Sequence, residues 1–198
     1  VQSRPDWCIS RQRSWGVPIP AFYDAQSEPI LDSRIVLKTA DLVEEHGSNV
    51  WFERDVADLW AAVKPDDWYG AEPVAKYTDT LDVWIDSGSS SRTVLMQREE
   101  LACDGVADIY LEGSDQHRGW FQSSLLLSLA GNGVAPYRNV LTHGFMVDAD
   151  REKISKSKQA GGYTKPQTAE AYVGKYGADI VRLWVASQDF RNDIIVSE

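Results

Sequence analysis

Three segments of the chain repeat one pattern of apolar and polar positions. Each begins with a short apolar run, continues into small or acidic residues, and is followed by a helical pattern or a loop. The apolar runs cover residues 80–85, 107–111 and 140–147. Strands that alternate with helices at this spacing are typical of βαβ units, so the pattern predicts a parallel sheet, and the third run is typical of a buried strand. Because ligands on such sheets bind beyond the carboxyl ends of the strands, we expect the polar residues after each run to lie at one binding edge.

Helical patterns follow the first two runs, near residues 91–101 and 116–130. The second is apolar nearly all round, which predicts a deeply buried helix. Ser114 or Asp115 can cap its first turn and leave backbone N–H groups facing the crevice. Helices are also predicted from Pro166 to a stop at Gly177, and over 179–187 with one apolar face.

Residues 24–75 do not follow this rhythm. Prolines and paired aspartates punctuate the segment, while residues 42–46 and 56–63 have helical patterns. We therefore predict a small inserted α/β subdomain over 24–75, and we assign 1–23 and 76–198 to the domain around it.

Composition narrows the class of protein. At 198 residues the chain can bury the core of one domain, or of one domain with an insert. Its two cysteines are too few and too far apart for a disulfide framework or a cysteine-based zinc site, which favours a reducing, cytoplasmic location. No apolar run approaches the about 18 residues of a membrane span.

A net charge of −10 argues against a nucleic-acid-binding surface on this piece by itself. The chain starts at Val1 and stops in an apolar stretch, so we expect it to be part of a longer protein.

The loop after the third apolar run has the clearest chemistry. It places the ammonium groups of Lys153 and Lys156 beside the hydroxyls of Ser155 and Ser157, ahead of two glycines. Such lysines can neutralise charge on departing phosphoryl oxygens, and the hydroxyls can donate to the same oxygens. For five residues alone, a solvated basic turn is the simpler interpretation. Other segments favour the phosphate site.

These other segments form an ordered set with the lysine loop. Residues 113–121 read Gly-Ser-Asp-Gln-His-Arg-Gly-Trp-Phe, and residues 153–157 read Lys-Ile-Ser-Lys-Ser. Together with stretches 6–20, 82–89 and 176–184, they resemble class I aminoacyl-tRNA synthetases, and among these the isoleucine enzymes. The lysine loop is similar to the family's Lys-Met-Ser-Lys-Ser signature, with isoleucine in place of methionine. The other family signature, His-Ile-Gly-His, is not in the chain.

The resemblance implies a fold and an activity. The fold would be α/β: a parallel-sheet, Rossmann-type nucleotide-binding half-domain with a small inserted α/β subdomain, forming the C-terminal half of the catalytic domain. The activity would be ATP-dependent activation of isoleucine to isoleucyl-adenylate and its transfer to tRNA(Ile), with ATP bound as its Mg²⁺ complex. The parent enzyme would be a monomer in the cytoplasm. Without the first signature, the chain alone is expected to be inactive.

Site residues follow partly from chemistry and partly from the resemblance. Carboxylates such as those of Glu112 and Asp115 accept hydrogen bonds from ribose hydroxyls or a substrate ammonium, and Gly113 between them allows close approach to the backbone. The resemblance assigns catalysis to Lys156 and Lys153. It assigns ATP or adenylate binding to Glu112, Gly113, Asp115, Met146, Ser155, Lys156 and Ser157. We predict no protein-bound zinc or other metal site, because His143 has no Cys or His partner at ligand spacing.

The amino-acid pocket is predicted from two tryptophans and an amide. Trp84 lies at a predicted strand end, and Trp120 lies one helical turn past Gln116 on the same face. Facing indoles would make a dry slot for a branched aliphatic side chain, and the resemblance places isoleucine there. Core packing is the alternative for any single tryptophan.

Three other functions remain open. The chain could belong to a valyl or other branched-chain synthetase, although residues 116–120 favour the isoleucine enzymes. It could be a noncatalytic, synthetase-derived binding module, which the intact lysine loop disfavours. An unrelated nucleotidyl transferase would share the phosphate chemistry but would not need two pocket tryptophans.

Overall fold

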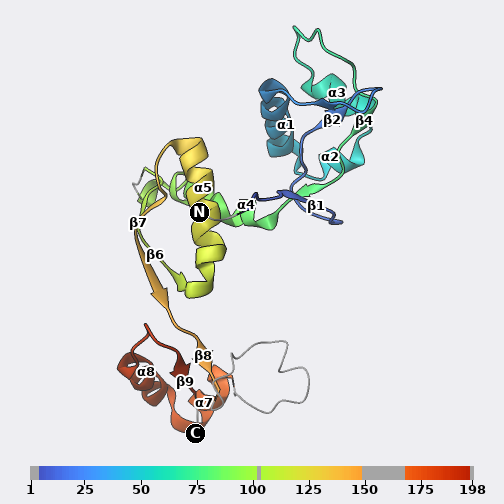
Figure 1. Ribbon diagram of the computed structural model, residues 1–198. Coiled ribbons are helices and arrows are strands. Elements are labelled where there is room, and N and C mark those ends of the chain that lie inside the picture. Colours follow the sequence, from blue (N-terminus) through green and yellow to red (C-terminus); the bar gives the residue numbers. More distant parts are fainter. Residues whose placement is uncertain (1–4, 102–103, 149–167, 197–198) are drawn as a thin grey trace. The chain divides into compact units, whose positions relative to one another are not determined.

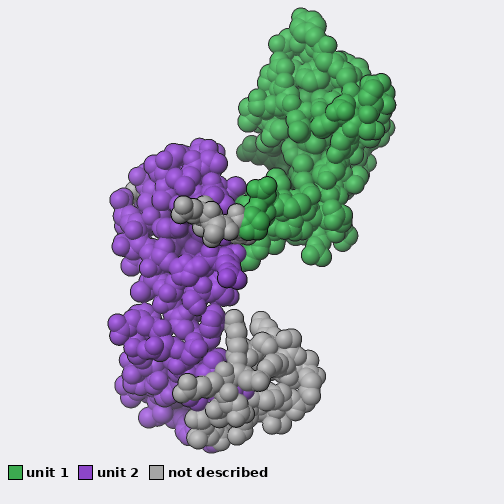
Figure 2. Space-filling view, in the orientation of Figure 1, with its two compact units in different colours: residues 1–86 green, residues 87–198 purple. Residues whose placement is uncertain are grey.

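The computed structural model describes residues 5–101, 104–148 and 168–196 (Figure 1). The chain divides into two compact units, Val1–Asp86 and Ser87–Glu198 (Figure 2). Within the described ranges, no helix is both long and apolar enough to cross a membrane.

The first unit joins short strands to helices. Its elements in chain order are β1 (Ser10–Arg11), β2 (Phe22–Tyr23), β3 (Pro29–Ile30), α1 (Ser33–His46), α2 (Val50–Glu53), α3 (Val56–Val63), β4 (Ala75–Lys76), β5 (Thr80–Leu81) and α4 (Val83–Gly88), whose last residues enter the second unit. Strand β2 pairs antiparallel with both β3 and β4, and β1 pairs antiparallel with β5.

The helices of this unit enclose an aromatic core. Asp32 caps α1 by accepting from the backbone N–H of Arg34 at 2.8 Å, and Gly47 ends the helix with a φ of 79°. The rings of Phe22 and Trp51, both fully buried, lie 5.1 Å apart at the centre. The buried cluster comprises Phe22, Ile30, Ile35, Trp51, Leu59, Trp60 and Val63. The helical patterns over 42–46 and 56–63 are confirmed by α1 and α3, whereas the boundaries of a subdomain over 24–75 stay a prediction.

The second unit is organised around one βαβ unit. Its elements are η1 (Ser91–Leu95, a π-helix), η2 (Glu99–Leu101, a 3₁₀-helix), β6 (Ala107–Gly113), η3 (Ser114–Arg118, a 3₁₀-helix), α5 (Trp120–Asn132), β7 (Tyr137–His143), β8 (Met146–Val147), α7 (Ala169–Tyr176), α8 (Ala178–Ser187) and β9 (Ile194–Ile195). Strands β6 and β7 pair in parallel from Ala107↔Tyr137 to Gly113↔His143, with α5 as the crossover, so the predicted βαβ unit over this part is confirmed. A second parallel pair joins β8 to β9.

Helix α5 differs from its prediction in where it starts and in what it buries. It begins at Trp120, because η3 occupies the preceding residues and Gly119 breaks the backbone with φ −126° and ψ −117°. Its buried face carries Phe121 and serines, while Leu129 is 47% exposed, so the deep burial expected for the leucines is wrong. The hydroxyl of Ser124 donates to Trp120 O at 2.6 Å, so this serine can be buried without an unsatisfied hydroxyl.

The first apolar run is not a single strand. Only Thr80–Leu81 is extended, and it pairs antiparallel with β1 rather than joining a parallel sheet. The rest forms α4, because the buried carboxylate of Asp82 accepts from Trp84 N–H at 3.1 Å and starts a helix there. The helix predicted over 91–101 is likewise two short pieces, η1 and η2.

The third run is also divided, and it is not buried as predicted. Strand β7 ends at His143 and β8 resumes at Met146, while Val140 and Leu141 are each 38% exposed. Downstream, the stop of α7 at Gly177 is confirmed, and Pro166 lies outside the described residues. Helix α8 matches its predicted range, but its expected apolar face is exposed at Ile180 and Leu183.

Candidate functional site

The carboxyl ends of β6 and β7 bring two titratable side chains together. Glu112 and His143 are the last or next-to-last residues of their strands, and Glu112 Oε2 lies 3.9 Å from His143 Nε2. Glu112 Oε2 also accepts from the backbone N–H of Gly113 at 3.2 Å, and its side chain is 53% exposed. The carboxylate is therefore held at the carboxyl edge of the strand pair, with about half of its surface exposed. Sequence reasoning placed Glu112 at this edge but missed His143 as its neighbour, because the predicted run over 140–147 continues past His143, where the observed strand β7 ends.

The backbone turns tightly after Glu112. Gly113 is buried, and a Cβ at this position would lie 2.7 Å from Asp115 Oδ1 and 3.2 Å from Phe145 Cε1. A side chain here would displace the carboxylate of Asp115 or the ring of Phe145. Glycine thus keeps β6, η3 and the segment after β7 close together.

Gln116 has a structural role that its sequence position did not reveal. Its Oε1 accepts from the backbone N–H of Trp120 at 3.0 Å and so caps the first turn of α5. This corrects the expectation that Ser114 or Asp115 would cap the helix. The 3₁₀ turn between Gln116 and Trp120 also means that the two residues do not share one continuous α-helix.

Trp120 is half-buried and closely held. Its Nε1–H is within hydrogen-bonding distance of Ser87 O, at 2.9 Å, and of Ser90 Oγ, at 3.2 Å. One face of its indole stacks on Tyr110, with ring centroids 4.1 Å apart and planes inclined by 7°. The segment 87–90, which follows the first apolar run, therefore lies beside the start of α5.

Trp84 belongs to the other compact unit. It lies on α4 rather than at a strand end, and its side chain is 39% exposed. Its pairing with Trp120 across a pocket stays a prediction.

Asp82 organises the start of α4. The residue is 3% exposed, and its Oδ2 accepts from Trp7 Nε1 at 2.9 Å and from the guanidinium of Arg11. Burial raises the pKa of Asp82, but hydrogen bonds from Trp7 and Trp84 and the charge of Arg11 outweigh it, so the pKa lies below its ordinary value. Burial and the nearby Asp82 carboxylate raise the pKa of Asp86. Nothing in the sequence periodicity singled out Asp82.

The segment that leads to the lysine loop is anchored by a distant loop. Gly144 N–H donates to Phe190 O at 2.8 Å, and Phe145 N–H donates to the carboxylate of Asp193 at 2.7 Å. Met146 follows on β8, opposite Ile194, and is 51% exposed. The four predicted phosphate-binding residues, Lys153, Ser155, Lys156 and Ser157, lie outside the described residues.

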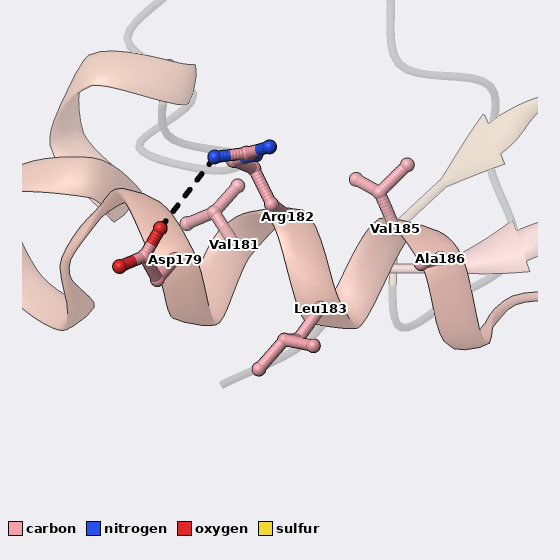
Figure 3. A pocket seen from close by; sticks show the side chains of 6 residues that line it. All are labelled: Asp179, Val181, Arg182, Leu183, Val185 and Ala186. Atoms are coloured by element: carbon pink, nitrogen blue, oxygen red, sulfur yellow. Dashed lines mark ion pairs between the residues drawn. The ribbon is translucent and has the colours of Figure 1, made fainter.

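Neither a metal centre nor the hollow along α8 coincides with the predicted site residues that the structure describes. Among residues 5–101, 104–148 and 168–196, no group of three or more His, Cys, Asp or Glu side chains is placed to hold a metal ion. An open hollow of about 750 Å³ lies along α8, where Asp179 and Arg182 form an ion pair of 3.6 Å (Figure 3). Its lining is Asp179, Val181, Arg182, Leu183, Val185 and Ala186, and includes none of the predicted site residues.

Comparison with known proteins relates the whole chain to one family. A profile described as tRNA synthetases class I (I, L, M and V) matches residues 1–197. The chain is 52% identical over 200 residues to an isoleucine–tRNA ligase of Methylacidiphilum infernorum, and 52% identical over 198 residues to one of Syntrophotalea carbinolica. All of this chain is matched in both cases, but it spans only 20% and 21% of those proteins.

A solved structure supports the same fold. The LeuRS of Agrobacterium radiobacter K84, crystallised in a ternary complex with tRNA and LeuAMS, matches with a TM-score of 0.59 at 20% identity. The match covers 98% of this chain and 25% of that one, and at this identity it supports the α/β fold alone. Since the class I profile covers nearly every residue, the chain belongs to the class I tRNA synthetases of the isoleucine, leucine, methionine and valine group.

Proposed function

We propose that this chain is part of the catalytic domain of an isoleucyl-tRNA synthetase, which activates isoleucine with ATP and transfers it to tRNA(Ile). The observation that carries the proposal is the match of this whole chain, at 52% sequence identity, to about a fifth of the length of isoleucine–tRNA ligases. The parallel β6–β7 pair, with Glu112 at its carboxyl edge, supports a nucleotide site in that position. On this proposal β6 and β7 belong to a larger Rossmann-type sheet in a parent enzyme that works as a cytoplasmic monomer.

The chemistry divides among the site residues. The isoleucine carboxylate attacks the α-phosphorus of ATP, and pyrophosphate leaves with the electron pair of the broken P–O bond. Lys156 and Lys153 stabilise the charge on the departing phosphates, and Ser155 and Ser157 donate to the same oxygens. Mg²⁺ arrives as part of the ATP substrate and shares that charge.

Residues near β6 orient the reacting groups. Glu112, half-exposed at the strand end, accepts hydrogen bonds from the ammonium group of isoleucine or from the adenylate, and Asp115 accepts from the ribose. Gly113 and Met146 lie alongside the nucleotide. Because Gln116 Oε1 already accepts from Trp120 N–H, its Nε2 donor is the atom that would contact the polar end of the substrate.

Trp120 is proposed to form one wall of the amino-acid pocket, and Trp84, in the other compact unit, keeps the pocket role only as a prediction from the sequence. Apolar walls exclude water and favour a branched aliphatic side chain. Support for this role comes from the anchoring of Trp120, whose indole is held by Ser87, Ser90 and Tyr110 while remaining only half-buried.

The test is isoleucine-dependent ATP–pyrophosphate exchange in the full-length protein. Isoleucine should support exchange far better than valine, leucine or methionine, and tRNA(Ile) should be charged. A preference for valine would instead identify a valyl enzyme, and absence of exchange with every amino acid would identify a noncatalytic module.

Lys156→Ala provides the mechanistic test. Loss of a charge that acts in the transition state should lower kcat by an amount equivalent to about 2–4 kcal/mol, with a smaller change in KM. Lys158→Ala, next to the signature, is the matched control and should change kcat much less. An unchanged kcat with only a raised KM in Lys156→Ala would contradict the assigned role.

A further inference from the structure

The indole of Trp120 is fixed in both position and tilt. Ser87 O and Ser90 Oγ, at 2.9 and 3.2 Å from Nε1, hold the nitrogen edge of the ring. The ring of Tyr110 lies nearly parallel to the indole, at 7° and with the ring centroids 4.1 Å apart, and packs against one face of it. An anchored edge and a stacked face together restrict rotation of the side chain. All four residues belong to the second compact unit.

The ring of Tyr110 is itself packed between other aromatic rings. Tyr110 is 3% exposed on β6, its ring lies 4.8 Å from that of Tyr137, and Phe121 packs at 6.3 Å. Its hydroxyl is buried and has no hydrogen-bond partner among the residues that the structure describes. Since buried polar groups are normally paired, the hydroxyl does not account for the residue at this position. What accounts for a tyrosine at this position is the flat aromatic surface that it presents to Trp120.

We infer that Tyr110 is a positioning residue for amino-acid selection, which holds the Trp120 wall of the pocket rigid so that isoleucine is distinguished from valine. The inference rests on the proposed function, because it takes Trp120 as a wall of the isoleucine pocket. Isoleucine exceeds valine by one methylene group, so a wall that could relax inward would recover part of its contact with the smaller substrate. Stacking on Tyr110 prevents that relaxation without Tyr110 contacting the substrate.

The experiment compares variants of the full-length enzyme that keep or remove the stack. Tyr110→Leu and Tyr110→Met keep apolar side chains at the buried position but remove the flat ring, whereas Tyr110→Phe keeps the ring and removes the unpaired hydroxyl. The measurement is kcat/KM for isoleucine and for valine in ATP–pyrophosphate exchange, with the KM for ATP as an internal reference. Circular dichroism identifies which variants are folded.

Variants without an aromatic ring at position 110 should lose isoleucine preference, and a variant that keeps the ring should retain it. A folded Tyr110→Leu or Tyr110→Met should lose about five- to twentyfold of the isoleucine preference, within the range that a single methylene provides, with the KM for ATP unchanged. Tyr110→Phe should retain the preference within about twofold. If neither ringless variant folds, Tyr110→Trp is measured instead. Its ring is too large for the same stack, so this variant should also lose the preference for isoleucine.

Trp120→Ala distinguishes failure of this inference from failure of the pocket. If Trp120→Ala loses the preference but folded ringless Tyr110 variants keep it, the positioning role is overturned and the proposed pocket stands. If Trp120→Ala itself keeps the preference, the pocket assignment fails and the inference fails with it. Loss of preference in Tyr110→Phe would also overturn the role of the ring.

Discussion

At Gly144 two backbone segments approach so closely that a side chain has no room. Its N–H donates to Phe190 O at 2.8 Å, and an added Cβ would overlap the carbonyl of Asn192 and lie 2.6 Å from Asp193 N. The obstacle is backbone, which cannot rotate away as a side chain can. Gly144→Ala should therefore destabilise the protein by about 1–3 kcal/mol, measured by urea unfolding.

Gly174 provides the matched control for this substitution. It lies inside α7, and among the described residues a Cβ there would have no heavy atom within 4 Å apart from its chain neighbours and the helix's own backbone. Gly174→Ala should be neutral or should stabilise the protein by up to about 1 kcal/mol, because alanine favours a helix interior. Equal destabilisation by both changes would show that crowding at Gly144 is not the cause.

At the scale of elements, one carboxylate connects β1, β5 and α4. Asp82, next to β5, accepts from Arg11 on β1, from Trp7 and from the first turn of α4. Asp82→Asn keeps an oxygen acceptor but removes the charge opposite Arg11. We expect a loss of about 1–3 kcal/mol of unfolding free energy at pH 7.

The same substitution should remove a pH dependence. Because the folded-state pKa of Asp82 lies below its ordinary 3.8, the stability it contributes is present above pH 3.8 and is lost as pH falls through the folded pKa. The difference between wild type and Asp82→Asn should therefore narrow on acidification below pH 3.8. Asp67→Asn is the control: it removes an exposed ion pair with Arg34 and should change stability little. A difference that stays constant with pH would refute the role of the ionised carboxylate.

At the scale of the whole molecule, one face of the β6–β7 pair is left exposed by the residues that the structure describes. Tyr110 is buried on the side that packs against α5, whereas its neighbours Ile109 and Leu111 are 56% and 54% exposed, and Leu111 is in register with Leu141, which is 38% exposed. Parallel sheets are normally covered on both faces. Because the chain spans about a fifth of its curated relatives, we expect other parts of the longer protein to cover this face.

Leu111→Gln tests that expectation in two forms of the protein. In the 198-residue chain the change should alter unfolding free energy by less than about 0.5 kcal/mol, because the side chain is already half in water. In the full-length protein it should destabilise by about 2–3 kcal/mol, because the same side chain is then buried. Arg138→Gln, a polar change on the paired strand, should have little effect in either form. Equal effects of Leu111→Gln in both forms would mean that nothing covers the sheet.

Local patterns in the sequence were sufficient for family membership and for several elements. Helix α3, the stop of α7 at Gly177 and the β6–α5–β7 unit were predicted because capping residues and apolar spacing act within a few residues of each other. The ordered motifs likewise identified class I synthetases, and they placed Glu112 at the end of a parallel strand. The pocket and phosphate roles of individual residues stay predictions.

Tertiary structure decided the features that depend on residues far apart in the chain. Strand β5 is only two residues long, Thr80–Leu81. It pairs with β1, which lies some 70 positions earlier in the chain, and it ends where the buried carboxylate of Asp82 starts α4. The serine face of α5 is buried because its hydroxyls can bond back to the helix, which hydrophobic periodicity does not register. The stack of Tyr110 on Trp120 requires a strand and a helix to meet at one angle and spacing. Sequence periodicity reports which side of an element is apolar, but the partner that an element meets is set by packing of the folded chain.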